Sequence, residues 1–273
     1  MRSHELIKRL GVAVIGIPAI FALIYLGKLA FLLFSMLVVG LALFEFYLMM
    51  EKKGGAPAKY WGVLIALFLG PVLFWQWDRS LYLIGAVLVS LLIELFRGKT
   101  NPTNNVAQTL GGVIYVGLFY ALMLVRELPG QLGWSYATGA WLIYLIFISI
   151  WICDTAAYGF GSWLGRHPLY KRISPNKTWE GAIAGLVTGV ASAALIQYFF
   201  IPALTLKDGL VIGFIVGLFG QLGDLVESMF KRDAGVKDSS NLLPGHGGVL
   251  DRFDSPLMVG PLVLIYLLIR FHG

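Results

Sequence analysis

The chain has 273 residues, of which 58% are hydrophobic and only 13% are charged, and its mean hydropathy is +0.78. Soluble domains carry about 25% charged residues, so this composition argues strongly against a soluble all-α protein with an apolar core. The net charge of +6 fits basic loops that face anionic lipid headgroups better than it fits nucleic-acid binding. The single cysteine, Cys153, excludes an intramolecular disulfide, and its apolar neighbours predict a small buried side chain.

Apolar segments with the length of membrane-spanning helices follow one another along the whole chain. They lie at about 10–27, 29–50, 61–76, 80–96, 108–125, 139–163, 180–201, 209–230 and 256–271. We interpret the first as a retained span and not as a cleaved signal peptide. No internal repeat or linker is visible, so we predict an all-α, polytopic membrane protein with about nine transmembrane helices. Residues 1–273 are expected to form a single transmembrane domain, with N-terminal spans at about 10–125 and a motif-bearing half at about 139–273.

The basic residues alternate between the two sides of this predicted topology. Successive connections carry 16 of the 21 Lys and Arg residues on one side and 5 on the other. Positive charge favours the cytoplasmic side, so we expect a cytoplasmic N-terminus in a prokaryotic inner membrane. Two long polar loops, at about 164–179 and 231–255, then also face the cytoplasm. A soluble anionic substrate would bind there.

Polar side chains gather at the end of the eighth predicted span. Asp224, Glu227, Ser228 and Lys231 are spaced i, i+3, i+4 and i+7, which places them on one helix face. An acidic group at membrane depth costs about 2.5 to 3.5 kcal/mol on insertion scales, so it usually lines a cavity or binds a ligand. A Glu227–Lys231 ion pair at the helix end is the simpler alternative for those two residues.

The loop that follows combines glycines, basic residues and aspartates. Glycines let peptide N–H groups approach phosphate oxygens closely, and Lys237 and Arg252 supply positive charge. Asp251 and Asp254 are three residues apart and could face one hard cation such as Mg²⁺ if a helix begins there. His246 has no second His or Cys nearby, so zinc is not expected; a phosphate contact, a proton transfer and a turn-stabilising hydrogen bond stay open.

A second group of polar residues surrounds the loop at about 164–179. Asp154 lies inside an apolar segment, where a carboxylate is costly. The Ser174-Pro-Asn sequence predicts a turn, and the next helix is expected to begin near Thr178 or Trp179, beside Lys177 as a candidate phosphate ligand. Glu45 and Glu94, near the ends of two earlier spans, are interpreted mainly as helix-end anchors.

Residues 228–254 resemble the signature of the phosphatidate cytidylyltransferase (CDP-diacylglycerol synthase) family. The matching positions are Ser228, Lys231, Arg232, Lys237, Asp238, Ser240, Leu243, Pro244, His246, Gly247, Gly248, Asp251, Arg252 and Asp254. The segments that begin at Asp154 and Ser174 are also similar to family motifs, although Asn176 stands where the family usually has Lys. The resemblance covers the chain from about residue 150, and the earlier part only by hydropathy.

The resemblance implies that CTP and phosphatidic acid react to give CDP-diacylglycerol and pyrophosphate. It implies Mg²⁺ as cofactor, held by Asp224, Asp251 and Asp254, with a second cation left open. The implied catalytic residues are Asp224, Lys231, Lys237, Asp238, His246, Asp251, Arg252 and Asp254. The implied substrate-binding residues are Asp154, Lys177, Thr178, Ser228, Arg232, Gly247 and Gly248. Membrane lipids are expected partners, nucleic acid is not, and a homodimer is left open.

Other functions are compatible with parts of this pattern. A related enzyme could transfer the cytidylyl group to another lipid or phosphorylate a lipid alcohol. A secondary transporter would often show inverted repeats and polar groups near the midplane, whereas here no repeat is visible and the polar groups cluster toward one face. A structural scaffold would leave the intramembrane aspartates unexplained.

Overall fold

The computed structural model describes residue 14 and residues 16–240, 242 and 247–271. Among these residues, seven helical segments are long and apolar enough to cross a membrane, and one of them, Pro102–Gln131, consists of two consecutive helices. Two shorter apolar helices span Gly16–Leu26 and Lys59–Phe74. Every predicted span overlaps one of these nine segments, and residues 10–13 and 15 of the first predicted span lie outside the described residues. The prediction of a helical membrane protein is therefore confirmed. The predicted count of nine transmembrane helices is not confirmed, because the two short helices are shorter than a membrane-spanning helix needs to be.

The chain divides into two compact units, and the boundary falls inside three helices. Unit 1 is Met1–Met123 with Phe230–Phe253, and unit 2 is Leu124–Met229 with Asp254–Gly273. The helices α6 (Tyr120–Gln131), α9 (Leu206–Asp233) and α10 (Leu250–Phe271) each contribute one part to either unit. The expected single domain over the whole chain stays a prediction.

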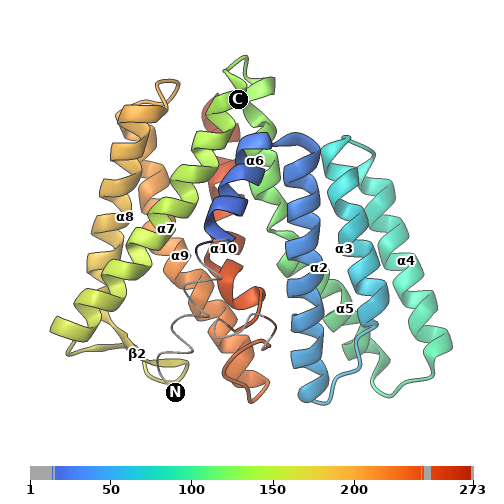
Figure 1. The fold of residues 1–273 in the computed structure, drawn as a ribbon. Helices are drawn as coiled ribbons and strands as arrows, with labels where there is room; N and C mark the ends of the chain where they lie inside the picture. The colour runs from blue at the N-terminus through green and yellow to red at the C-terminus, as the bar shows by residue number, and fades with distance from the viewer. Residues whose placement is uncertain (1–13, 15, 241, 243–246, 272–273) are drawn as a thin grey trace. The chain divides into compact units, whose positions relative to one another are not determined.

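Unit 1 is built on four helices, α2 (Lys28–Lys52), α3 (Lys59–Phe74), α4 (Arg79–Arg97) and α5 (Pro102–Gly117), of which α2, α3 and α4 stand side by side in Figure 1. Its close packing depends on Tyr47 of α2, whose hydroxyl donates to the Thr109 carbonyl at 2.6 Å. A Cβ atom at Gly62 or Gly112 would collide with the Tyr47 ring, so both positions need glycine.

Aromatic contacts attach the segment Phe230–Phe253 to the rest of unit 1. At its start, the Phe230 ring lies 5.7 Å from Phe46 and 5.2 Å from Tyr115. At its end, the Phe253 ring lies 5.3 Å from Phe119. Such edge-to-face pairs add to the free energy gained by burial. Both ends of the motif loop, the polar segment at about 231–255, are therefore fixed to the rest of unit 1.

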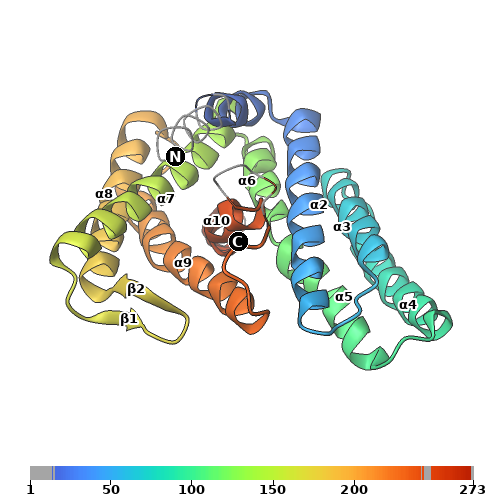
Figure 2. The same cartoon turned by 60° about the horizontal axis from the view of Figure 1, so that its bottom comes forward.

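Unit 2 contains α7 (Tyr136–Leu164), α8 (Trp179–Phe200) and most of α9, and Figures 1 and 2 show α7 and α8 side by side. Small residues allow these helices to approach closely, which is common in membrane proteins. A Cβ atom on Gly185 would lie 3.0 Å from the Cys153 carbonyl oxygen, and one on Gly217 would lie 2.9 Å from Leu186 Cα. Cys153 itself is buried, as predicted.

A small antiparallel hairpin joins α7 to α8, formed by β1 (Pro168–Tyr170) and β2 (Ser174–Thr178). The prediction of a turn at Ser174-Pro-Asn was wrong, because these residues lie in β2 and the turn falls at 171–173. Proline is compatible with an extended strand at a sheet edge, and a two-stranded hairpin has only edges. The predicted start of α8 is confirmed. It begins at Trp179, and its N-cap Thr178 accepts a hydrogen bond from the Gly181 N–H at 3.2 Å.

Candidate metal and substrate site

Three carboxylates converge within unit 2. Oxygen atoms of Asp224, Glu227 and Asp254 all lie within 4.8 Å of one another. The Glu227 side chain is fully buried, and the two aspartates are partly exposed. Three acidic groups this close repel one another unless a cation or protons neutralise them. Two oxygens bound to one Mg²⁺ lie about 3 to 4 Å apart, given its short metal–oxygen bonds. Small side-chain rotations would bring the three carboxylates to that spacing, so they fit a magnesium ion.

Close packing of α9 against the part of α10 that begins at Asp254, within unit 2, creates this cluster. Asp224 and Glu227 are one turn apart on α9, as the spacing predicts, and Asp254 lies in the first turns of α10. Between them, a Cβ atom on Gly223 would lie 2.7 Å from the Asp254 carbonyl oxygen. Glycine at position 223 therefore lets the backbones approach closely enough for the carboxylates to meet.

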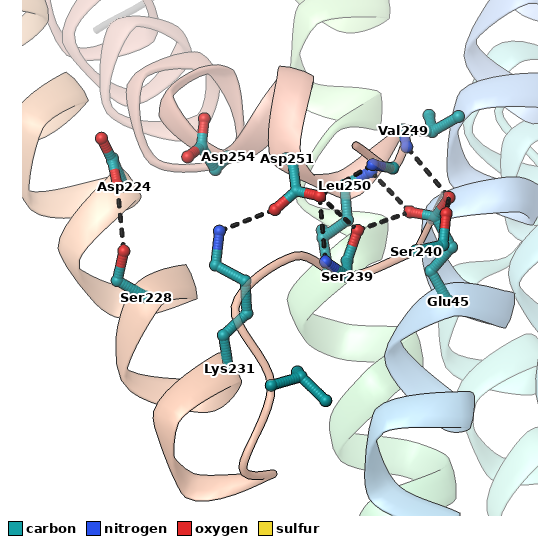
Figure 3. Close-up of polar contacts among 12 residues, drawn as sticks. Glu45, Asp224, Ser228, Lys231, Ser239, Ser240, Val249, Leu250, Asp251 and Asp254 are labelled. Atoms are coloured by element: carbon teal, nitrogen blue, oxygen red, sulfur yellow. Dashed lines mark hydrogen bonds and ion pairs between the residues drawn. The ribbon is translucent and has the colours of Figure 1, made fainter. Parts of the chain in front are cut away.

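Lys177 on β2 brings positive charge to the acid cluster. Its Nζ atom lies 2.7 Å from Asp224 Oδ2, and both side chains are partly exposed. The other Asp224 oxygen accepts a hydrogen bond from the Ser228 hydroxyl at 3.2 Å (Figure 3). Asp154 on α7 is exposed and interacts electrostatically with Asp224 and Lys177. With Asp254, five residues proposed from sequence thus come together in unit 2.

Asp251 lies in a different set of contacts, within unit 1. Its Oδ1 accepts from Lys231 Nζ at 2.6 Å, and its Oδ2 accepts from the Ser239 backbone N–H at 2.9 Å (Figure 3). The same Oδ2 accepts from the Gly248 backbone N–H at 2.8 Å. The Asp251 side chain is only 6% exposed. The predicted magnesium ligand set of Asp224, Asp251 and Asp254 therefore differs from the cluster in unit 2, where Glu227 accompanies Asp224 and Asp254.

Glu45 on α2 contacts two parts of the motif loop, residues 239–240 and residues 249–250. Its Oε1 accepts from the Ser240 hydroxyl at 2.7 Å and from Val249 N–H at 3.0 Å. Its Oε2 accepts from the Ser239 hydroxyl at 3.0 Å and from Leu250 N–H at 2.8 Å. The interpretation of Glu45 as a helix-end anchor was wrong, because its side chain is 3% exposed and binds a distant segment. A carboxylate inside an apolar helix was the sequence signal for such a role.

The remaining predicted residues lie mostly at the surface. Lys237, Asp238 and Arg252 are exposed, as is Arg232, whose guanidinium donates to the Val236 carbonyl at 3.0 Å. Gly247 has a positive φ of 77°, which favours glycine. Leu243, Pro244 and His246 lie outside the described residues.

The chain matches the cytidylyltransferase family model over residues 7–270. It is 36% identical to the phosphatidate cytidylyltransferase of Synechocystis sp., with 94% of each chain covered. It is 34% and 35% identical to the proteins of that name from Staphylococcus haemolyticus and Staphylococcus saprophyticus, with 94% of this chain and 96% of each relative covered. The similarity therefore includes the N-terminal spans, which sequence motifs alone did not assign.

Proposed function

Because the chain belongs to the cytidylyltransferase family, we propose that it transfers the cytidylyl group of CTP to phosphatidic acid. A phosphate oxygen of phosphatidic acid attacks the α-phosphorus of CTP. The bond from that phosphorus to the oxygen between the α- and β-phosphates breaks. CDP-diacylglycerol and pyrophosphate are the products. This proposal rests on the similarity, over 94% of the chain, to relatives named phosphatidate cytidylyltransferase. The lipid product, CDP-diacylglycerol, belongs to phospholipid biosynthesis.

Magnesium is the proposed cofactor, and Asp224, Glu227 and Asp254 are its proposed ligands. The support is their mutual spacing within 4.8 Å and the hard oxygen donors that Mg²⁺ prefers. When bound, Mg²⁺ would offset the negative charge of the triphosphate. The Asp251 carboxylate, which resemblance also suggested as a ligand, is proposed instead to hold Lys231 and the backbone of the motif loop, given its hydrogen bonds to them.

Basic side chains have the proposed task of binding phosphate groups. Lys177 is the first candidate, since it lies beside Asp224 and is partly exposed. Lys237 and Arg252 add positive charge at the exposed surface of the motif loop, where a nucleotide could reach it. In phosphoryl transfer the protein mainly positions the reactants and stabilises developing charge, so these residues need no covalent role.

A lipid substrate needs an apolar surface near the charged site. Unit 2 contains an apolar pocket of about 270 Å³, lined by the hairpin, α8 and α9 and including Tyr170, Trp179 and Leu225. Leu225 is adjacent to Asp224 in the chain. Almost no polar surface lines this pocket, so we propose that it accepts an acyl chain and not a nucleotide.

The active site is proposed to face the cytoplasm of a bacterial inner membrane, because the positive-inside count places the basic loops there. Lys171 lies in the exposed hairpin turn and Cys153 is buried, so Lys171→Cys would introduce a single accessible thiol. A membrane-impermeant maleimide should label this variant in inverted vesicles and not in intact spheroplasts. The reverse labelling would contradict the proposed orientation.

The reaction itself is tested with purified protein in detergent, CTP labelled at the α-phosphate and phosphatidic acid, with and without Mg²⁺. The expected result is labelled CDP-diacylglycerol that requires Mg²⁺. A parallel reaction with label at the γ-phosphate distinguishes a kinase, which would label the lipid from that position only. Product from a different lipid acceptor, but not from phosphatidic acid, would replace the proposed substrate.

A further inference from the structure

We infer that Glu45 is a positioning residue, which closes the motif loop by holding residues 239–240 and 249–250 on one carboxylate. Glu45 belongs to α2, almost 200 residues before this loop. The contacts all lie within unit 1 and are drawn in Figure 3. The catalytic part of this inference depends on the proposed cytidylyl transfer, whereas the anchoring of the loop does not.

The hydrogen bonds explain why a carboxylate is present at this buried position. Two oxygens offer about four acceptor sites, and all four are used by two serine hydroxyls and two backbone N–H groups. The two N–H groups, of Val249 and Leu250, belong to the N-terminus of α10, where a negative charge is favourable. The donors offset the cost of removing the Glu45 carboxylate from water.

The loop residues are adapted to this carboxylate. A Cβ atom at Gly248 would collide with Glu45 Oε2 and with the Ser239 hydroxyl. The Ser239 backbone N–H donates to Asp251 Oδ2 at 2.9 Å. Glu45 and Asp251 therefore hold the same serine, and Asp251 in turn binds Lys231. Displacing Glu45 would alter the backbone on both sides of the loop and the position of Asp251.

The amide of glutamine cannot replace this carboxylate. One Glu45 oxygen accepts from Val249 N–H and the other from Leu250 N–H. In either orientation of the substituted amide, its NH₂ group would face a backbone donor. Glu45→Gln therefore keeps the size of the side chain and breaks the loop attachment. Glu51→Gln is the matched control on the same helix, because Glu51 pairs with Lys59 and does not contact the loop in the structure's described contacts.

The first experiment measures the loop directly, by limited trypsin digestion of the purified protein and mass spectrometry. Lys237 and Arg252 are exposed and lie on either side of the Glu45 contacts. Hydrogen bonds to charged groups are worth enough for Glu45→Gln to accelerate cleavage at Lys237 by about tenfold or more. Glu51→Gln should digest like the wild type. Equal cleavage in Glu45→Gln and wild type would overturn the inference.

The second experiment measures the effect on the reaction. Glu45→Gln is expected to raise the KM for CTP by about tenfold and to leave the KM for phosphatidic acid within about twofold, because the loop carries the basic groups proposed for the nucleotide. A general loss of folded protein would lower the apparent kcat and leave both KM values unchanged. That result, or a CTP KM equal to wild type, would refute a positioning role.

A milder variant keeps the inference testable if Glu45→Gln does not fold. Ser240→Ala removes one of the four donors and should increase both cleavage and the CTP KM by about threefold. If it behaves like wild type in both assays, the inference fails even when Glu45→Gln cannot be purified. If the wild-type protein transfers no cytidylyl group but Glu45→Gln still releases the loop, the proposed function fails and the anchoring stands.

Discussion

Lys177 Nζ lies 2.7 Å from Asp224 Oδ2, so an ion pair joins the β-hairpin of unit 2 to its cluster of three carboxylates. A lysine here offsets part of the repulsion among the acids. The same ammonium group is close enough to the proposed magnesium ligands to bind a phosphate oxygen of CTP. Hairpin and cluster thus combine the two kinds of charge that a metal–triphosphate complex requires.

We predict that Lys177→Met lowers kcat/KM for CTP by about 10- to 100-fold, because a charge-assisted contact to phosphate is lost. Lys171→Met, in the exposed turn of the same hairpin, is the control and should stay within about twofold of wild type, since single exposed charges contribute little. Initial rates at several CTP concentrations measure both variants. Equal losses in the two would indicate a general charge effect of the hairpin instead of a specific contact.

The acid cluster predicts opposite effects of Glu227→Gln with and without magnesium. In chelator, the variant should melt at a higher temperature than wild type, because removing one of three close carboxylates relieves repulsion. With millimolar Mg²⁺ the wild type should gain stability by ligand binding, and the variant should gain little. Thermal unfolding in detergent measures both effects.

Asp233→Asn provides the control for the magnesium prediction. Asp233 is on the same helix, half-exposed, and forms an ion pair with Lys53. Its replacement should leave the magnesium-induced shift in melting temperature at the wild-type value. A full shift in Glu227→Gln would remove Glu227 from the proposed ligand set.

Gly223→Ala tests whether close helix packing forms the cluster. The added methyl group would lie 2.7 Å from the Asp254 carbonyl oxygen, so α10 must move, at a cost of about 1 to 3 kcal/mol in the free energy of unfolding. The magnesium concentration for half-maximal activity should rise as the carboxylates separate. Gly111→Ala on α5 has open space around its Cβ position and should be neutral or slightly stabilising. Unchanged magnesium dependence in Gly223→Ala would contradict this account.

The positions of the helices, and the placement of Asp224 and Glu227 on one face of α9, were predictable from sequence. Both features depend only on residues that are close together in the chain. Apolar length located α7, predicted at 139–163 and observed at Tyr136–Leu164. Helical spacing correctly placed Asp224 and Glu227 on one face, and the N-terminal signals correctly placed the start of α8. Such local patterns determine which residues share a surface.

Contacts between side chains of different helices and loops were not predictable, because they depend on how these elements pack. Asp251 and Asp254 are three residues apart, yet one binds Lys231 and the other joins the acid cluster. Glu45 contacts residues 194 to 205 positions away, which no local pattern reports. The break between α5 and α6 also interrupts a continuous apolar run, at Leu118 and Phe119, without a proline or a charge to mark it.

The buried pair of Lys231 and Asp251 gives a final prediction about stability. Their side chains are 11% and 6% exposed, and Nζ lies 2.6 Å from Oδ1. Lys231→Met should destabilise the protein by about 3 to 5 kcal/mol, because it leaves a buried carboxylate without its cation. Adding Asp251→Asn should recover part of this loss, since the uncompensated charge is removed. The pair Lys53 and Asp233, about half-exposed, is the matched control, and Lys53→Met should cost less than about 1 kcal/mol. A double-mutant cycle from reversible denaturant unfolding in mixed micelles measures the coupling. Strict additivity of Lys231→Met and Asp251→Asn would show that the two groups do not stabilise each other.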